Sequence, residues 1–397
     1  MRGGSKSSCR GGAGSFGILP GAKGRASPAR PCRLGDAMKS VRTLAIAVGL
    51  FFAAGLMAQN EAPKLPPADP NAPPPSLQAN ADPGYDAALA ACKNPPRKFP
   101  PIHWPATGPA PSEYQVTAIP GVIAAGQRWK FLWQDAGNDG DGIVGTRDGG
   151  LLIARNDKSD VVKLDKNGKA SVVYTGTHTG GALSINAKGA LFVDERGLNP
   201  AIWELAPHRR VLADKYQGET MDCIGGILND LTADSKGGAY FSMGGLFYAS
   251  PKGVVTKYGE NLRTNGIILS PDERHLYVTN VGTVVEFDVQ PDGSLTNQRD
   301  FAKLQDKTAG DGSAVDADGR VYVSTGPGVQ VIGADGTWLG LIPTPRDIIS
   351  VSFGGPGRRT LFILARGAED STGQQIANAA QVYSIPMIAH GPSNRPK

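Results

Sequence analysis

The sequence lacks the long amphipathic periodicity of a helical protein. Apart from one apolar run near the N-terminus, no long window of its 397 residues repeats apolar side chains every 3.6 positions. Glycine and proline are instead abundant, with 53 and 31 residues, and hydrophobic residues make up 40% of the chain. This composition argues against a helical protein and favours a turn-rich β protein with a sizeable core.

Motifs for covalent catalysis are also missing. The chain has no G-x-S-x-G sequence, and Cys223 has no His at a spacing that would indicate a catalytic pair. Only four cysteines are present, and two of them lie in the first 37 residues, so that Cys92 and Cys223 remain. The sequence leaves open whether these two form a disulfide, which an exported protein permits.

An excess of basic charge is absent outside the first 42 residues. Nine Lys or Arg and one acid in that stretch carry a charge of +8, so the net charge of +5 leaves −3 for the rest of the chain. A mildly acidic remainder gives no support to nucleic-acid binding.

The N-terminal apolar run has the features of a secretory signal peptide. From Met38 the chain reads MKSVRTLAIAVGLFFAAGLMAQN, with basic residues, an apolar core and a small-residue exit. We therefore expect an exported protein, periplasmic or secreted. The alternative is a signal segment that stays attached as an anchor, and membrane contact is expected only in that case.

Four regions are expected along the chain. Residues 1–37 read as a low-complexity leader before a plausible start at Met38, and residues 38–58 as the signal peptide. Residues 59–112 are a Pro-rich extension that cannot build a core of its own and is expected to act as an extended linker. Residues 113–390 are expected to form the folded domain.

Six segments of this domain repeat one pattern: a short apolar strand, a Gly/Asp/Lys turn and a second apolar strand. The second strand carries a bulky residue at a fixed place, and these marker residues are 37 to 48 positions apart. They are Leu152, Phe192, Tyr240, Tyr277, Tyr322 and Phe362. The pattern predicts an all-β fold, a six-bladed β-propeller with four-stranded antiparallel blades. The segment EYQVTAIPGV, from Glu113, is expected to close the last blade as its outer strand.

Four of the six repeats begin their first strand with Asp or Asn. Asp141, Asn229 and Asp311 each precede their marker residue by 11 positions, and Asn265 precedes its own by 12. Because the first strands of a propeller line its axis, these side chains are expected to converge. Two carboxylates and two amides suit a hard divalent cation, with Ca²⁺ first and Mg²⁺, Mn²⁺ or Zn²⁺ as alternatives. The competing interpretation is that each pair only begins a turn.

Several stretches resemble the senescence marker protein / gluconolactonase / luciferin-regenerating enzyme family. They include LADKYQGETMDCIGGILNDLTADSKGGAYFS, TNGIILSPDERHLYVTN and GDGSAVDADGRVYVSTGPGVQVIGADG, and the resemblance covers about residues 130–388. It implies one catalytic metal on the axis, held by a Glu, two Asn and an Asp. Asn229, Asn265 and Asp311 match these ligands, whereas the Glu position holds Asp141, which is one methylene shorter.

The resemblance also implies supporting and substrate-contacting positions. Asp230, which follows the first ligand Asn, is implied to orient the site. Many sugar-lactone hydrolases of the family carry an Arg two residues before that Asn, and Ile227 here indicates a more apolar substrate. His178, Arg263 and Arg346 are weaker candidates for substrate contact, because a loop His and exposed Arg residues are often incidental.

The activity implied by the resemblance is hydrolysis of a small lactone or related ester. The metal would polarise the carbonyl and acidify a bound water, and Asp311 would act as the general base. A hypothesis from a different class is a non-catalytic exported propeller that binds a ligand or protein and uses the metal only for rigidity.

Overall fold

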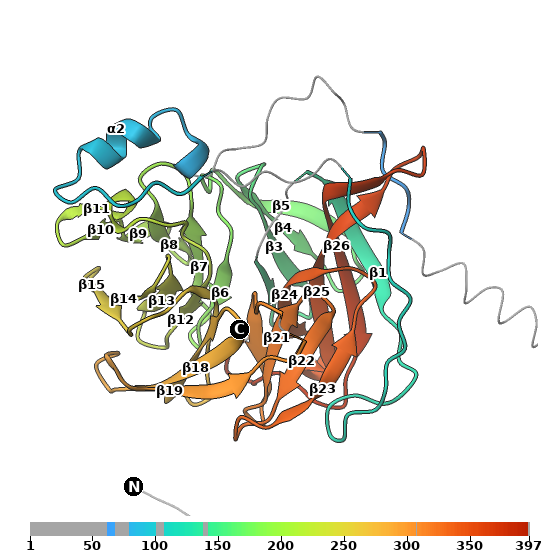
Figure 1. Cartoon of the computed structure of the whole chain (residues 1–397). Coiled ribbons are helices and arrows are strands. Elements are labelled where there is room, and N and C mark those ends of the chain that lie inside the picture. The colour runs from blue at the N-terminus through green and yellow to red at the C-terminus, as the bar shows by residue number, and fades with distance from the viewer. Residues whose placement is uncertain (1–61, 68–78, 101–106, 138–141, 307, 396–397) are drawn as a thin grey trace, which may run out of the picture. The chain divides into compact units, whose positions relative to one another are not determined.

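Six four-stranded antiparallel sheets follow one another along the chain (Figure 1). The computed structural model describes residues 62–67, 79–100, 107–137, 142–306 and 308–395. All of them belong to one compact unit, Leu56–Lys397. The predicted leader and signal peptide lie outside the described residues. Within the described part of the chain, no helix is both long enough and apolar enough to cross a membrane.

Blades 1 to 5 each take four consecutive strands from the chain. Blade 1 consists of β2 (Ile143–Gly145), β3 (Leu151–Arg155), β4 (Asp160–Leu164) and β5 (Ala170–Thr175). Blade 2 consists of β6 (Leu183–Ile185), β7 (Leu191–Glu195), β8 (Ala201–Ala206) and β9 (Arg210–Ala213). Blade 3 consists of β12 (Leu231–Ala233), β13 (Ala239–Ser242), β14 (Leu246–Ala249) and β15 (Val255–Tyr258). Blade 4 consists of β16 (Thr264–Leu269), β17 (His275–Asn280), β18 (Thr283–Val289) and β19 (Leu295–Lys303). Blade 5 consists of β20 (Ser313–Val315), β21 (Val321–Thr325), β22 (Gly328–Ile332) and β23 (Trp338–Pro343).

Blade 6 joins the two ends of the domain. It contains β24 (Ile348–Gly354), β25 (Thr360–Glu369), β26 (Gln375–Pro386) and, as its outer strand, β1 (Lys130–Ala136). The prediction that EYQVTAIPGV closes the last blade was therefore wrong. That segment turns back on itself, with Ile119 bridged to Ile123, and its apolar residues pack into the core beside blades 5 and 6. The strand that pairs with β26 lies directly before blade 1.

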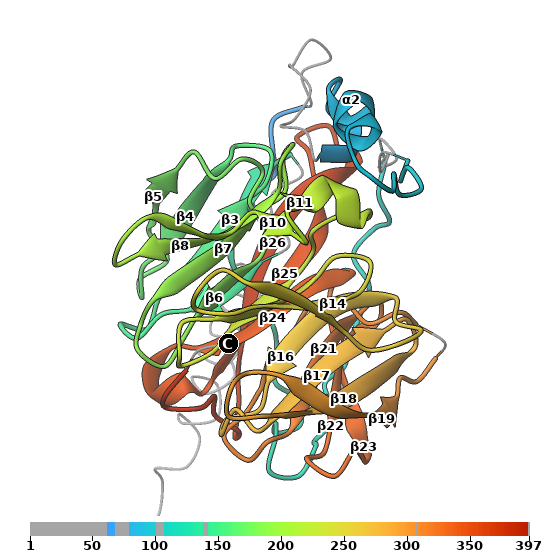
Figure 2. The same cartoon turned by 90° about the vertical axis from the view of Figure 1, so that its left-hand side faces the viewer.

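The six first strands contact one another in a closed ring. In order around the ring these strands are β2, β6, β12, β16, β20 and β24, and β24 contacts β2 again. In Figure 2, the first strands β6, β16 and β24 lie toward the middle and the outer strands β5, β19 and β23 toward the edge. The three-residue first strands are fully buried, whereas outer strands such as β5 and β15 are largely solvent-exposed. This arrangement confirms the predicted six-bladed propeller.

The marker residues lie between neighbouring blades. Each sits on the second strand of its blade, is at most 7% exposed, and belongs to a core cluster that includes residues of the next blade. Tyr322, for example, meets Phe353 of blade 6 edge to face, with 4.9 Å between ring centroids. Burial of one such side chain contributes about 2–3 kcal/mol. The repeat is thus a packing requirement, because each blade buries one large side chain against its neighbour.

The two ends of the ring differ in their loops. Asn229, Asn265 and Asp311 lie where the first strands begin, and we call this end the Asn end. The hairpins between first and second strands lie at the opposite end, which we call the turn end. There Asp234 accepts the main-chain N–H groups of the second and fourth residues after it, both at 2.8 Å, and Asn186 and Asp316 do the same in their blades. Side-chain acceptors of this kind fix the turn that follows a strand.

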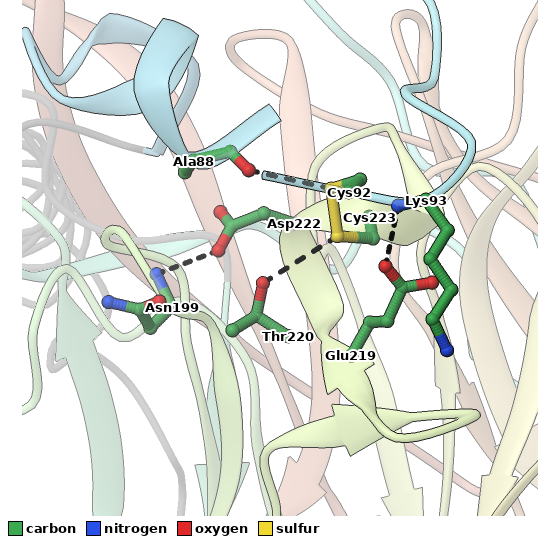
Figure 3. The surroundings of a disulfide bond; sticks show 8 residues. All are labelled: Ala88, Cys92, Lys93, Asn199, Glu219, Thr220, Asp222 and Cys223. Atoms are coloured by element: carbon green, nitrogen blue, oxygen red, sulfur yellow. Dashed lines mark hydrogen bonds between the residues drawn. A yellow bond between two sulfur atoms is a disulfide. The ribbon is translucent and has the colours of Figure 1, made fainter. Parts of the chain in front are cut away.

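The described part of the Pro-rich extension is attached to the Asn end. It contains η1 (Ala79–Ala81) and α2 (Tyr85–Ala90), which the sequence analysis did not anticipate. Cys92 forms a disulfide with Cys223 in η2 (Met221–Ile224), just before blade 3, and the two Cα atoms are 5.6 Å apart (Figure 3). A hydrogen bond of 2.8 Å from the N–H of Lys93 to Glu219, in the short β10–β11 hairpin (Lys215–Tyr216, Glu219–Thr220), accompanies it. The disulfide that the sequence left open is therefore formed.

The C-terminal tail lies under the turn end. After β26, the N–H of Ile388 donates to Val122 and the carbonyl of His390 accepts the N–H of Ala317, in the turn of blade 5. The N–H of Gly391 donates to the carbonyl of Arg358, in η3 (Pro356–Arg358) of blade 6. The tail thus crosses several blades.

Candidate functional site at the Asn end of the ring

Three of the four predicted metal ligands come together on neighbouring blades. Asn229 lies two residues before β12, Asn265 is the second residue of β16, and Asp311 lies two residues before β20. All three side chains are half-buried. Asp141, the fourth, lies outside the described residues. The structure places Asn229, Asn265 and Asp311 at one end of adjacent first strands. The convergence of their side chains on one axial cation stays a prediction.

Contacts through Ser242 and Gly266 connect these three residues across neighbouring blades. The N–H of Asn229 donates to the carbonyl of Ser242 at 2.9 Å, and the Ser242 hydroxyl donates to the carbonyl of Asn265 at 2.6 Å. Gly266, next in sequence, lies so close to blade 5 that an added Cβ would stand 2.0 Å from the carbonyl oxygen of Asp311. Packing thus requires glycine at position 266, because any larger residue would prevent this close approach of blades 4 and 5.

Asp230 joins blade 3 to blade 4. Its side chain is 5% exposed, and its two oxygens accept the N–H of Leu231 at 2.8 Å and of Ile267 at 3.1 Å. Its own N–H donates to the Ser242 hydroxyl at 3.1 Å. These contacts are compatible with the supporting role that the sequence predicts for it.

The side-chain oxygen of Asn265 indicates which kind of ligand the site suits. Oδ1 of Asn265 is buried and has no hydrogen-bond donor, and the hydroxyls of Ser324 and Ser350 beside Asp311 are also buried without a partner. An unpaired buried acceptor costs about 1–3 kcal/mol, so such oxygens call for a ligand or water. An amide oxygen next to a carboxylate is a donor set that a hard cation prefers. The residues present therefore fit a divalent cation.

Clusters made only of the common ionisable metal ligands are absent from the described part of the chain. No three side chains among its His, Cys, Asp and Glu residues lie together in a metal-binding arrangement. The candidate site differs in kind from such a cluster, because two of its predicted donors are amides.

His178 and Ile227 lie on loops at the same end. The carbonyl of His178 accepts the N–H groups of Arg196 and Gly197, at 3.1 and 3.0 Å, and its ring Nδ1 lies 2.9 Å from Glu195. The His178 side chain is 71% exposed, whereas burial raises the pKa of the Glu195 carboxyl. Ile227 is half-buried and precedes Asn229 by two residues. Both side chains are placed where a substrate approaching the Asn end could meet them.

The two arginines proposed as weaker candidates have different surroundings. Arg263 is exposed, and its N–H donates to the side chain of Asn280 at 2.8 Å. Arg346 is 7% exposed and donates to the carbonyl of Pro109 and to Gln375, at 3.2 and 2.9 Å. These partners of Arg346 belong to the extension and blade 6, so the structure does not bring it to Asn229 or Asp311.

Sequence reasoning missed Arg196. This arginine follows β7 directly, its side chain is 0% exposed, and it donates through Nη2 to the carbonyl of Asn229. Its Nε donates to the fully buried Asp194 at 3.1 Å. Burial raises the pKa of Asp194 to about 7, against the lowering effect of Arg196 and of two main-chain donors. A signal in the sequence was the charged run Asp-Glu-Arg at the end of a second strand, where blades 3 and 5 have uncharged residues.

The fold and part of the sequence match known proteins. The family model described as the SMP-30/Gluconolactonase/LRE-like region matches residues 210–366. The gluconolactonase of Zymomonas mobilis subsp. mobilis is 26% identical over 292 residues, which cover 62% of this chain and 78% of that protein. The structure of a gluconolactonase from Xanthomonas campestris superposes with a TM-score of 0.56 at 22% identity, covering 71% of this chain and 98% of that one. A calcium-binding protein, regucalcin, from Agrobacterium tumefaciens superposes with a TM-score of 0.53 at 18% identity, covering 67% and 95%. Residues 210–366 of this chain therefore resemble the SMP-30/Gluconolactonase/LRE-like region, and the propeller shares its fold with a solved gluconolactonase structure.

Proposed function

We propose that the chain hydrolyses lactones or related cyclic esters at the Asn end of the ring, with one divalent cation held by Asp141, Asn229, Asn265 and Asp311. The observation that carries the proposal is the buried Oδ1 of Asn265, which accepts no hydrogen bond. Asn265 lies on the blade next to that of Asp311, so that an amide oxygen and a carboxylate are available on neighbouring blades. Similarity to the gluconolactonase of Zymomonas mobilis supports the reaction class.

The cation and the side chains are proposed to have different roles in the reaction. When bound, a divalent cation polarises a carbonyl oxygen and lowers the pKa of a coordinated water. Asp311 is proposed to take the proton of the attacking water, because it is the one carboxylate among the predicted ligands that the structure describes. Its main chain is held by a 2.9 Å hydrogen bond to Ser324. Asn229 and Asn265 contribute neutral oxygens, and Asp230 keeps blades 3 and 4 in register beside them.

The substrate is proposed to be less polar than a sugar lactone. Ile227 occupies the position at which many sugar-lactone hydrolases of the family carry an Arg, and its half-buried side chain offers no donor to hydroxyl groups. A hydrophobic contact in that place favours a lactone with an apolar substituent.

We also propose that the protein is exported. The predicted signal peptide motivates this, and the Cys92–Cys223 disulfide supports it, because disulfides persist mainly in oxidising compartments. Activity lost on expression of the reduced protein and regained on reoxidation would agree with export.

The test is a panel of lactones and aryl esters, assayed with chelator-treated protein and with protein loaded with Ca²⁺, Mg²⁺, Mn²⁺ or Zn²⁺. Asp311→Asn is assayed beside Asp318→Asn, a matched control in the exposed turn of the same blade. We expect chelation and Asp311→Asn each to lower kcat/KM by about 10²–10⁴, and the control to behave as wild type.

Two results would contradict the proposal. Hydrolysis that is indifferent to chelation and to Asp311→Asn would remove the metal-dependent mechanism. Binding of Ca²⁺ with no hydrolysis of any compound in the panel would favour the alternative, a non-catalytic propeller in which the cation is structural.

A further inference from the structure

Blades 2 and 3 carry different residues at one equivalent position. Asp194 and Ser242 each follow their marker residue by two positions. In blade 3 the Ser242 hydroxyl donates to the main-chain carbonyl of Asn265, the predicted ligand of the following blade, at 2.6 Å. A hydroxyl from one blade thus holds a predicted ligand of the next.

Blade 2 cannot use Asp194 in this way. One oxygen of the Asp194 carboxyl accepts the N–H groups of Gly181, at 2.9 Å, and Ala182, and the other accepts Nε of Arg196 at 3.1 Å. Since both oxygens act as acceptors, neither is available as a donor to the carbonyl of Asn229. A different group must supply that hydrogen bond.

Arg196 supplies it. Its guanidinium reaches the carbonyl of Asn229 by crossing the main chain of Gly181, where an added Cβ would lie 1.9 Å from Cζ and 2.1 Å from Nε. Any side chain at position 181 would therefore displace the guanidinium. The three residues act together. Gly181 provides the space, the Asp194 carboxyl orients the Arg196 guanidinium, and the guanidinium donates to blade 3.

We propose that Arg196 is a positioning residue that holds Asn229 at the Asn end of the ring, in the role that the Ser242 hydroxyl has for Asn265. This inference rests on the proposed function, because it takes Asn229 to be a ligand of the site.

The contacts of Asn229 show how the positioning works. Asn229 precedes β12 and so lies outside the ladder of blade 3, but its N–H donates to Ser242 and its carbonyl accepts from Arg196. Both main-chain groups are fixed, which fixes the direction of its side chain. Arg196 is itself fully buried, so we take it to act on a substrate or cation through Asn229. Supporting groups of this kind typically alter metal affinity about 10–100-fold.

The experiment compares two double variants that differ by one hydroxyl. In D194A/R196M the donor to Asn229 is lost without leaving a buried carboxylate unpaired. In D194S/R196M a serine stands at the position equivalent to Ser242 and can restore the hydrogen bond. R209M is the matched control, because Arg209 is a blade 2 arginine whose side chain is 41% exposed.

Two measurements are made on the full chain with its disulfide intact. Hydrogen exchange is followed by mass spectrometry in peptides that cover residues 226–231 and, as internal reference, residues 263–268. Ca²⁺ affinity is measured by calorimetry. We expect exchange at 226–231 to be about fivefold faster in D194A/R196M, the equivalent of one net hydrogen bond, and Ca²⁺ affinity to fall about tenfold. In D194S/R196M the exchange rate and the Ca²⁺ affinity should return toward the wild-type values. In R209M both should equal the wild-type values.

Equal exchange in the two double variants would overturn the proposal, and so would faster exchange with unchanged Ca²⁺ affinity. If D194A/R196M does not fold, R196K replaces it, since a lysine keeps the charge beside Asp194 but loses the guanidinium fork. Wild-type protein that neither binds Ca²⁺ nor hydrolyses a lactone would remove the proposed function. The exchange comparison would still decide whether Arg196 holds Asn229.

Discussion

Each end of the ring buries one arginine completely, and the two arginines have different tasks. At the Asn end, Arg196 donates to the main chain of Asn229, while the oxygen of Asn265 nearby stays without a donor. At the turn end, Arg395 of the C-terminal tail donates to the Thr232 hydroxyl at 2.7 Å and lies 3.5 Å from Glu273. Glu273 in turn accepts the N–H and hydroxyl of Ser235, in the turn of blade 3, at 3.0 and 2.7 Å.

This difference separates function from stability within one domain. A buried polar atom without a hydrogen-bond partner lowers the stability of the folded protein. Residues with such atoms are retained where the atom binds a ligand. A tail that is anchored by a buried ion pair contributes stability but offers nothing to a substrate. We therefore expect substitutions at the Asn end to change activity more than stability, and substitutions at the turn end to do the reverse.

The largest effect is expected for Asn265→Ala. Loss of a ligand should exceed the 10–100-fold effect of a supporting group, so we expect kcat/KM to fall about a thousandfold. The free energy of unfolding without metal should stay the same or rise by up to about 1 kcal/mol, because a buried unpaired oxygen is removed. Lactonase assays and urea titrations check both values, with the exposed Asn167→Ala in blade 1 as control. A loss of stability that matches the loss of activity would break the comparison.

Removal of the disulfide should come next. It closes a separation of 131 residues, and we expect Cys92→Ser with Cys223→Ser to lower the free energy of unfolding by about 3 kcal/mol. Proteolysis should then cleave the segment 79–100 at the Asn end, while the tail 388–395 at the turn end stays protected. Equal release of both segments would show that the two ends are not independent.

A smaller loss of stability is expected for Arg395→Met at the turn end. Breaking a buried ion pair costs about 3–5 kcal/mol, but Glu273 is 15% exposed and can recover some hydration, so we expect about 2 kcal/mol. Urea midpoints measure this value. The kcat/KM of the folded protein should change less than twofold, and a larger change would mean that the tail acts on the site across the ring.

The repeat could be predicted from the sequence, but the two arginines could not. Tyr240 and Tyr322 mark their blades because each must fill the space against the next one, which leaves a periodic signal. Arg196 and Arg395 find their acceptors 33 and 163 residues away, on other blades, and no local pattern records such a contact. The prediction of the closing strand was wrong for the same reason. EYQVTAIPGV and β1 are similar apolar segments, and only the pairing with β26 decides which of them completes blade 6.

The disulfide and the site show the same limit. Cys92 and Cys223 lie in α2's flanking turn and in η2, two elements whose proximity follows only from how the extension packs. The place of Asn229, Asn265 and Asp311 at one end of the ring could be predicted, because a propeller repeats its geometry and similar offsets from the marker residues mean similar places on the ring.

The smallest effect concerns selectivity at the Asn end, through Ile227→Arg. This substitution adds the donor that many sugar-lactone hydrolases of the family carry, in a half-buried place two residues before Asn229. One charge-assisted hydrogen bond to a substrate hydroxyl is worth about 1.5 kcal/mol, so the ratio of kcat/KM for a polyhydroxylated lactone over an alkyl lactone should rise about tenfold. Ile227→Met keeps the position apolar and should leave the ratio unchanged. If both variants leave the ratio unchanged, substrates do not pass this residue, and the preference must be set by the His178 loop or by the tethered segment 79–100.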